Sequence, residues 1–190
     1  MKLIYKGKFS GDVNTLPMGE HEPGAVQFKE PQSMKNFAIV MNVAAGLIAV
    51  VCMILVVRLG GLQPGAWIAG ALLALLAMVP HELLHAICFK DEVYMYTNLK
   101  QGSMFVVGTE RMSKARFVFM SLLPNLVFGF IPFIIFLFVP QWTLLGVFGA
   151  VGISGGAGDY LNVFNALTQM PRGAKTYMHG FHSYWYQDKT

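Results

Sequence analysis

The sequence predicts an all-α membrane protein with four transmembrane helices. Hydrophobic residues make up 55% of the chain and charged residues only 13%, against about a quarter charged in a typical soluble domain. The mean hydropathy is +0.51. Four apolar segments reach the roughly 20 residues that a helix needs to cross a bilayer, and these are Asn36–Val57, Pro64–Phe89, Ala115–Val139 and Trp142–Gln169.

A chain of 190 residues with these spans has room for one membrane domain, over residues 36–170. The N-terminal segment, residues 1–35, is polar and interrupted by Gly and Pro, unlike a cleavable signal peptide. The first span is therefore expected to act as the insertion signal. Residues 171–190 form a C-terminal tail, whose aromatic residues are expected to lie at the membrane interface.

The positive charges are distributed unevenly around the spans. Of the 14 Lys and Arg residues, five precede the first span, five lie between the second and third, three follow the fourth, and only Arg58 lies on the other side. Cytoplasmic loops carry the excess of Lys and Arg in membrane proteins. Both termini and the loop 90–114 are therefore predicted to be cytoplasmic, in a multi-pass protein of the cell membrane. The net charge of +4 is therefore interpreted as a signal of membrane topology. The sequence has no basic stripe interleaved with aromatic residues, so it does not indicate a nucleic-acid partner.

Two short β structures are expected outside the membrane. Residues 2–9 have the composition of a short strand. In the loop 90–114, two β-prone runs, residues 93–96 and 104–107, flank a Gly-containing turn at 98–103. This arrangement predicts a small cytoplasmic β-hairpin between the second and third transmembrane helices.

The segment His81-Glu82-Leu83-Leu84-His85 lies inside the second predicted span. Histidines four residues apart share one face of a helix and can bind a single Zn²⁺ ion, and the Glu between them can act as a general base. Ionisable groups are costly within a bilayer, so a functional reason for them is expected. We therefore predict one zinc ion bound by His81 and His85, with Glu82 as the catalytic acid/base.

A catalytic zinc site needs a third protein ligand, and Asp159 is the best candidate. It is one of only two acidic residues in the four spans. His81 and Asp159 each lie 17 residues after the start of their spans, at Pro64 and Trp142, and the two spans run in the same direction. At about 1.5 Å per residue, both lie roughly 25 Å along their helices. Cys88, the nearest thiol, is instead expected to pack as a small buried hydrophobe.

Two asparagines are further candidates for the site. Asn125 reaches the level of Asp159 when residues are counted inward from the cytoplasmic end of the third span, and Asn162 follows Asp159 by nearly one turn. Each is predicted either to bind the substrate or its oxyanion, or to make an interhelical hydrogen bond. His179 and His182 are expected in the interfacial tail, from which one could approach the mouth of the site.

These motifs resemble the bacterial "putative zincin peptidase" family, a domain-of-unknown-function group. The resemblance rests on the segment 81–86, on Leu123-Pro124 in the third span and on Gly158-Asp159 in a late helix, and it covers most of the chain from about Phe37. More remotely, the layout is similar to site-2-type intramembrane metalloproteases, which place the metal motif on one core helix and an Asp ligand two helices later.

The resemblance implies that His81, His85 and Asp159 are metal ligands and that Glu82 is the catalytic acid/base. The surroundings of Asp159 depart from the site-2 pattern, which has an Asn and a Pro upstream and a Gly directly after the Asp. Here Tyr160 follows Asp159. This departure affects the inference about substrate handling more than the inference about the metal.

The predicted function is zinc-dependent hydrolysis of peptide bonds in membrane proteins, near the cytoplasmic face of the lipid bilayer. Zinc would lower the pKa of a water molecule, and Glu82 would carry its proton to the leaving amine. The hairpin 93–107 either pairs with an extended substrate or only caps the helices. Two other classes stay open: a non-catalytic membrane metal-binding scaffold or sensor, and a small ion or proton transporter that uses Asp159 and Glu82 as a relay. The sequence indicates no oligomeric state.

Overall fold

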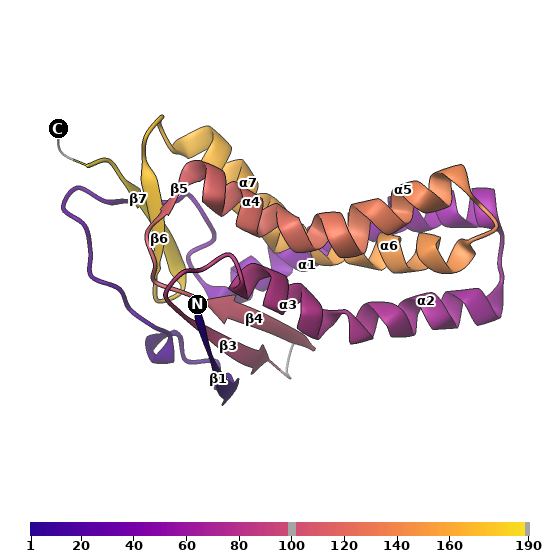
Figure 1. The fold of residues 1–190 in the computed structure, drawn as a ribbon, viewed down its shortest axis with the longest axis horizontal. Coiled ribbons are helices and arrows are strands. Elements are labelled where there is room, and N and C mark those ends of the chain that lie inside the picture. Colours follow the sequence, from indigo (N-terminus) through magenta and orange to yellow (C-terminus); the bar gives the residue numbers. More distant parts are fainter. Residues whose placement is uncertain (99–101, 189–190) are drawn as a thin grey trace.

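The computed structural model describes residues 1–98 and 102–188. The molecule is elongated, with helices along most of its length and two β-sheets gathered at one end (Figure 1). The chain leaves the sheet end twice, along residues 34–60 and 114–138, and returns twice, along residues 64–86 and 143–169, so both termini lie at that end (Figure 1). The site described below lies where the helices meet the sheets.

Seven α-helices form the elongated part of the described chain. They are α1 (Met34–Gly60), α2 (Pro64–Leu76), α3 (Met78–Ala86), α4 (Lys114–Asn125), α5 (Ile131–Phe138), α6 (Thr143–Gly155) and α7 (Ala157–Gln169). A 3-10 turn at Val13–Thr15 lies in the N-terminal segment, and a π-helical turn at Leu126–Phe130 joins α4 to α5. Three helical stretches of the described residues are long and apolar enough to cross a membrane: Met34–Gly60, Pro64–Ala86 and Lys114–Phe138.

The prediction of four continuous spans is wrong for the last one. The segment expected as a single helix is divided into α6 and α7, which are bent by 51° at Gly156. Each half has 13 residues and is about 20 Å long, too short to cross the apolar core of a bilayer alone. Adjacent glycines at 155 and 156 explain the break, because Gly stabilises a helix poorly. The Gly156 N–H bonds to the Ile153 carbonyl, three residues back instead of four.

The prediction of an all-α protein is also wrong, because the described residues form seven strands. They are β1 (Lys2–Lys8), β2 (Val26–Gln27), β3 (Glu92–Asn98), β4 (Ser103–Val107), β5 (Met112–Ser113), β6 (Lys175–His179) and β7 (His182–Tyr186). One sheet has the order β1-β3-β4 and the other the order β2-β7-β6-β5. The second sheet was not expected, because its pairing joins strands from the N-terminal segment, the middle loop and the tail.

The expected hairpin and N-terminal strand are confirmed, and they belong to one sheet. β3 and β4 pair antiparallel, with Tyr96 opposite Phe105, while β1 pairs parallel to β3, with Tyr5 opposite Met95. The tip of the expected turn, residues 99–101, lies outside the described residues, as do two of the charges counted for topology, Lys100 and Lys189.

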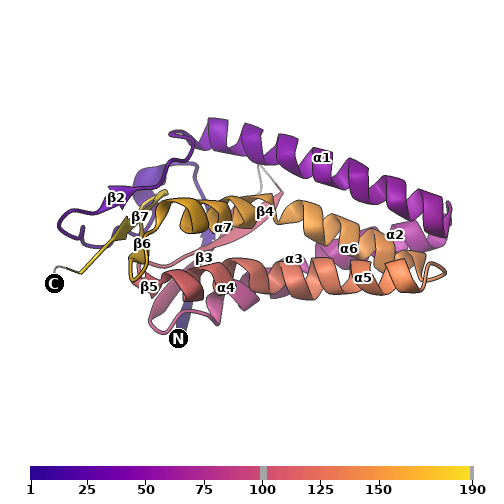
Figure 2. The same cartoon turned by 90° about the horizontal axis from the view of Figure 1, so that it is seen from above.

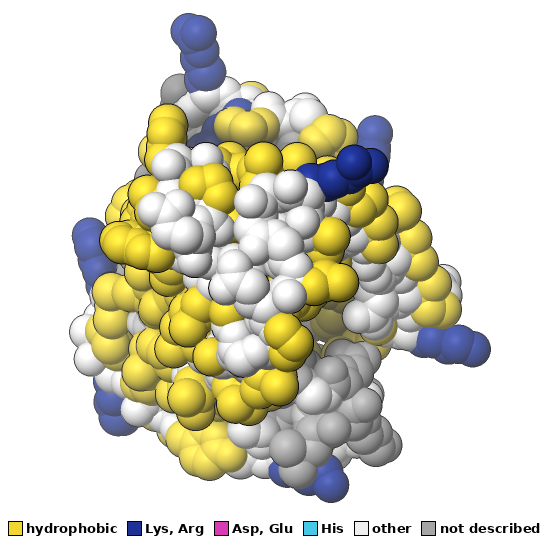
Figure 3. All heavy atoms as spheres, turned by 90° about the vertical axis from the view of Figure 1, so that its right-hand side faces the viewer, with side chains coloured by type: hydrophobic (Ala, Val, Ile, Leu, Met, Phe, Trp, Pro, Cys, Tyr) yellow, Lys and Arg dark blue, Asp and Glu magenta, His cyan; other side chains and the backbone are white. Residues whose placement is uncertain are grey.

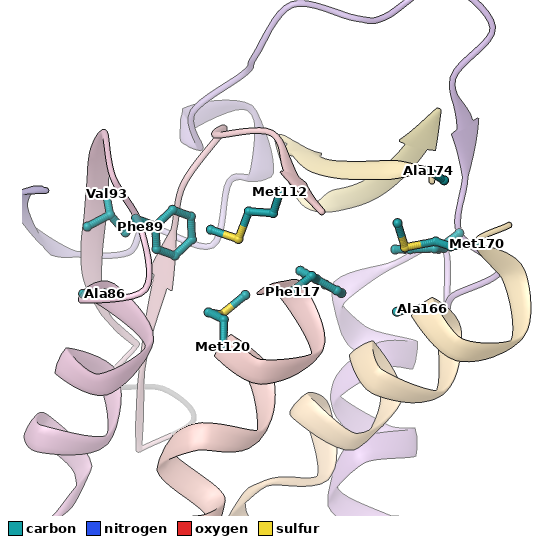
Figure 4. Close-up of a cluster of buried hydrophobic side chains, with 10 residues drawn as sticks. Ala86, Phe89, Val93, Met112, Phe117, Met120, Ala166, Met170 and Ala174 are labelled. Atoms are coloured by element: carbon teal, nitrogen blue, oxygen red, sulfur yellow. The ribbon is translucent and has the colours of Figure 1, made fainter. Parts of the chain in front are cut away.

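A buried apolar cluster joins the sheets to the helices (Figure 4). It brings α3, α4 and α7 into contact with strands of both sheets, since Val93 belongs to β3 and Met112 to β5. Its buried members are Phe28, Ala86, Phe89, Val93, Met112, Phe117, Met120, Ala166, Met170 and Ala174. The sheets are therefore packed onto the ends of α3, α4 and α7, and this packing fixes β4 close to α3.

The outer surface of the helices is apolar. α1 lies along one side of α6 and α7 and exposes large hydrophobic side chains such as Val43, Leu47 and Val51 (Figure 2). The end of the molecule away from the sheets is covered mainly by hydrophobic and uncharged side chains, with no acidic ones in view, and most of the basic side chains in view are fainter and lie farther back, toward the sheets (Figure 3). Such a surface is suited to contact with lipid.

Candidate metal centre

The motif histidines lie on a short helix that begins just before them. α2 ends at Leu76 and α3 begins at Met78, although the two together remain apolar enough for one span. Pro80 has no N–H to donate to the carbonyl of Leu76, so the interruption falls where the sequence removes a helical hydrogen bond. Within α3, His81 and His85 lie one turn apart, with ring centroids separated by 5.0 Å.

Asp159 lies in the first turn of α7, directly after the break in the helix pair. Its Oδ2 is 3.6 Å from Nε2 of His81, and its Oδ1 is 3.4 Å from Nε2 of His85. The three side chains thus face one another from two helices, although 74 residues separate His85 from Asp159 in the sequence. Within the described parts of the chain, these three residues form a group whose possible ligand atoms all lie within 4.8 Å of one another.

The group fits a zinc ion by its spacing and by the chemistry of its donors. Donor atoms in a tetrahedral zinc site lie about 3.3 Å apart, close to the separations of Asp159 from the two histidines. Nδ1 of His85 lies 2.9 Å from the backbone carbonyl of Met120, which can only accept a hydrogen bond. Nδ1 is therefore the nitrogen that carries the proton in the neutral ring, so that ring would offer the lone pair of Nε2 to a metal ion.

Glu82 lies beside this group but does not belong to it. It lines the same cavity as His81, His85 and Asp159, and it is adjacent to the backbone N–H of Val106 in β4. The cavity has a volume of about 330 Å³, within the range of small-ligand sites. Its walls are largely apolar, and they include Met34, Phe37, Phe105, Phe117, Met120 and Phe181.

The two predicted asparagines occupy different places. Asn162 lines the cavity, whereas Asn125 is fully buried and is absent from the described cavity wall. Nδ2 of Asn125 donates to Oδ2 of Asp159 at 2.8 Å. Asn125 therefore contacts one of the three grouped side chains, and Asn162 faces the space beside them.

The tail histidines and Cys88 lie outside the group. Nδ1 of His179 lies 2.6 Å from the Gly19 carbonyl oxygen, and Nδ1 of His182 lies 2.9 Å from Oε1 of Glu30. The Sγ of Cys88 donates to the Leu84 carbonyl at 3.4 Å. His182 is not part of the described cavity wall, but its hydrogen-bond partner Glu30 is.

Several residues of the cavity carry no signal in the sequence. Glu30, Phe181 and Ser183 come from the two terminal segments and are brought over the site by the four-stranded sheet. Their positions depend on strand pairings between residues more than 150 positions apart. Only a prediction of that pairing could have assigned them to the site.

A helix with His-Glu-x-x-His, a carboxylate from a second helix and an adjoining cavity define the class of zincin-type metallopeptidase sites. Residues 74–175, more than half of the chain, match the family described as "Putative zincin peptidase". The protein belongs to this family, as its resemblance in the sequence indicated. No curated protein and no solved structure matches the chain.

Proposed function

We propose that the protein is a membrane-embedded zinc metallopeptidase that cleaves apolar segments of membrane proteins near the cytoplasmic face. The position of Glu82 supports this function most strongly. Glu82 shares the cavity with the three candidate ligands but is not one of them. A scaffold or sensor needs ligands alone, whereas peptide hydrolysis also needs a free acid/base beside them.

Each residue then has a defined task. His81, His85 and Asp159 hold the zinc ion, and the hydrogen bond between His85 and the Met120 carbonyl fixes the orientation of one imidazole. When bound, zinc supplies a Lewis acid that polarises a carbonyl and acidifies water. Glu82 accepts the proton of the attacking water and returns it to the leaving amine nitrogen. Asn162, in the cavity wall, donates to the substrate or to its developing oxyanion.

The substrate is an extended peptide that adds to the edge of the three-stranded sheet. Among the described strands, β4 is the outer strand beside α3, and every one of its residues lines the cavity. Because Val106 directs its N–H toward Glu82 and away from β3, Met104, two residues earlier, directs its backbone groups the same way. An unpaired strand edge binds an extended chain through main-chain hydrogen bonds.

The sheet end of the molecule lies on the cytoplasmic side. Both termini and both sheets lie at this end (Figure 1), together with most of the Lys and Arg residues of the sequence. The candidate ligands lie near this end of the helices, so cleavage occurs close to the cytoplasmic border of the bilayer.

The proposal is tested by measuring zinc content and peptide cleavage on the same purified samples. Wild type is expected to bind one zinc ion and to cleave an apolar transmembrane peptide. Glu82→Gln should keep zinc and lose at least a hundredfold in kcat, because a general base contributes about 10²–10⁴. Asp159→Ala should lose zinc and activity together. Zinc binding without any cleavage by the wild type would favour a metal-binding scaffold, and full activity of Glu82→Gln would refute the assignment of the base.

A further inference from the structure

Asn125 occupies a special position at the metal centre, because it contacts a candidate ligand without entering the cavity. We propose that Asn125 is a positioning residue that fixes the Asp159 carboxylate in the orientation needed for metal binding. This inference rests on the metal site of the proposed function. It adds a residue from α4, a helix that contributes no ligand of its own.

The Asn125 amide is oriented by two hydrogen bonds. Its Nδ2 donates to Oδ2 of Asp159 at 2.8 Å and to the backbone carbonyl of Ser121 at 3.0 Å. Both acceptors lack a hydrogen to give, so the amide nitrogen and not the amide oxygen must face them. With Oδ2 of Asp159 held in this way, its Oδ1 is directed toward Nε2 of His85.

The oxygen of the Asn125 amide shows that this orientation costs free energy, because it leaves a buried acceptor unpaired in the part of the chain that the structure describes. Oδ1 of Asn125 is buried and has no hydrogen-bond partner among the described residues. Buried polar atoms are nearly always paired, so each unpaired one needs an explanation, and Nδ2 of Asn165 is another such atom in the described chain. For Asn125, the hydrogen bond from its nitrogen to Asp159 supplies that explanation, since its oxygen gains nothing from this position.

The break between α6 and α7 provides the space for the amide. A Cβ atom on Gly156 would stand 2.6 Å from Cγ of Asn125 and closer still to its Oδ1. Any other residue at position 156 would push the amide away from Asp159, three positions further along the chain. The same glycine thus ends α6, lets α7 turn toward the histidines and admits the side chain that holds Asp159.

The inference predicts that zinc affinity depends on Asn125. Removing a hydrogen bond to a metal ligand typically weakens metal binding by about 10–100-fold. Zinc dissociation constants of the full-length protein in detergent are measured by competition with a chromophoric chelator. Asn125→Leu and Gly156→Ala should each raise the zinc Kd by about 10–100-fold, the first by removing the donor and the second by displacing it.

Matched controls separate positioning from a general loss of packing. Asn165→Leu alters another buried asparagine, whose oxygen accepts a hydrogen bond from Gln169 and which, within the described structure, makes no hydrogen bond to any of the three ligands. Gly46→Ala, in the middle of α1, adds a methyl group where nothing lies within 4 Å. Both controls should keep the wild-type zinc Kd within about threefold. The visible d–d spectrum of the Co²⁺-substituted protein should change in the Asn125 and Gly156 variants and not in the controls, because it reports ligand geometry.

The outcomes distinguish this inference from the proposed function. If wild type binds zinc and both the Asn125 and Gly156 variants match its Kd and its Co²⁺ spectrum, the positioning role is refuted while the metallopeptidase proposal is untouched. If the variants lose affinity but wild type never cleaves a peptide, the positioning role stands and the enzymatic proposal fails. If the wild type binds neither metal, both are wrong.

Discussion

Arg116 holds the end of the metal-motif helix in place. Its Nε and Nη2 donate to the Cys88 carbonyl, at 2.9 Å and 2.5 Å, just beyond the last residue of α3. Its Nη1 pairs with Oε1 of Glu110 at 2.5 Å. Glu110 in turn accepts hydrogen bonds from the backbone N–H groups of Lys90 and Asp91. A basic residue counted in the sequence for membrane topology therefore also fixes the helix that carries His81 and His85.

Replacing Arg116 should destabilise the protein measurably. Arg116→Met removes charge-assisted hydrogen bonds to a helix end and is expected to lower the free energy of unfolding by about 2 kcal/mol. The measurement is thermal or denaturant unfolding in detergent. Arg172→Met, at an exposed position, should change it by less than about 0.5 kcal/mol. Equal stability of the two variants would contradict the role given to Arg116.

The ion pair between Arg116 and Glu110 depends on pH, because the Glu110 carboxylate can be protonated. Burial alone would raise the pKa of Glu110, but the Arg116 guanidinium and the N–H groups of Lys90 and Asp91 outweigh burial and lower the pKa below its ordinary value of 4.5. A lowered folded-state pKa gives stability that is present above pH 4.5 and is lost as the pH falls through the lowered value. Glu110→Gln should therefore be less stable than wild type at pH 7, and the difference should shrink under acid. A difference that grows as the pH falls would contradict this explanation.

At the level of elements, each part of the site comes from an interruption of regular structure. α3 begins after a break that follows from Pro80, and Asp159 follows the break at Gly156. β4 is the outer strand of a sheet, and its backbone groups on the side of α3 lack a strand partner among the described residues. Regular helices and closed sheets would leave neither the cavity nor an accessible edge.

The edge of β4 can be tested through its backbone. Met104→Pro removes an N–H directed away from β3 and should reduce kcat/KM for an extended peptide about tenfold, as expected for the loss of one hydrogen bond. Zinc content should stay unchanged. Met104→Ala shortens the same side chain but keeps the N–H, so it should retain more activity than the proline variant. If the alanine variant is equally impaired, the side chain and not the strand edge binds the substrate.

At the level of the whole molecule, both sheets, built from the two terminal segments and the middle loop, lie at one end of the helices (Figure 1), and the opposite end is mainly hydrophobic and uncharged (Figure 3). The turn between α1 and α2 lies at the opposite end, with Leu62 exposed. This division predicts which positions face each side of the membrane.

The orientation is tested by cysteine labelling in intact cells, with Cys52 and Cys88 replaced by Ser. Leu62→Cys should react with a membrane-impermeant maleimide added from outside. Lys90→Cys, at the sheet end, should react only after the membrane is permeabilised. The reverse pattern would invert the proposed orientation and place the site near the outer face.

The sequence predicted the side chains of the site better than the fold around them. His81 and His85 follow from local helical spacing, and Asp159 from a comparison of depth along two helices. The pairing of β1 with β3 could not be predicted from the sequence, because the two strands lie about 90 residues apart. A single short strand does not show which other strand it pairs with. The bend at Gly156 was also missed, since an apolar stretch rich in glycine is compatible with one continuous helix.

The central claim is that two histidines and one aspartate hold a single zinc ion, and X-ray absorption at the zinc edge of the purified wild-type protein tests it most directly. We expect one zinc per chain, with only nitrogen and oxygen neighbours at about 2.0–2.1 Å and the scattering signature of two imidazoles. Asp159→Ala should lose this signal. A sulfur neighbour at about 2.3 Å, which would bring in Cys88, or a protein that binds no zinc, would contradict the account.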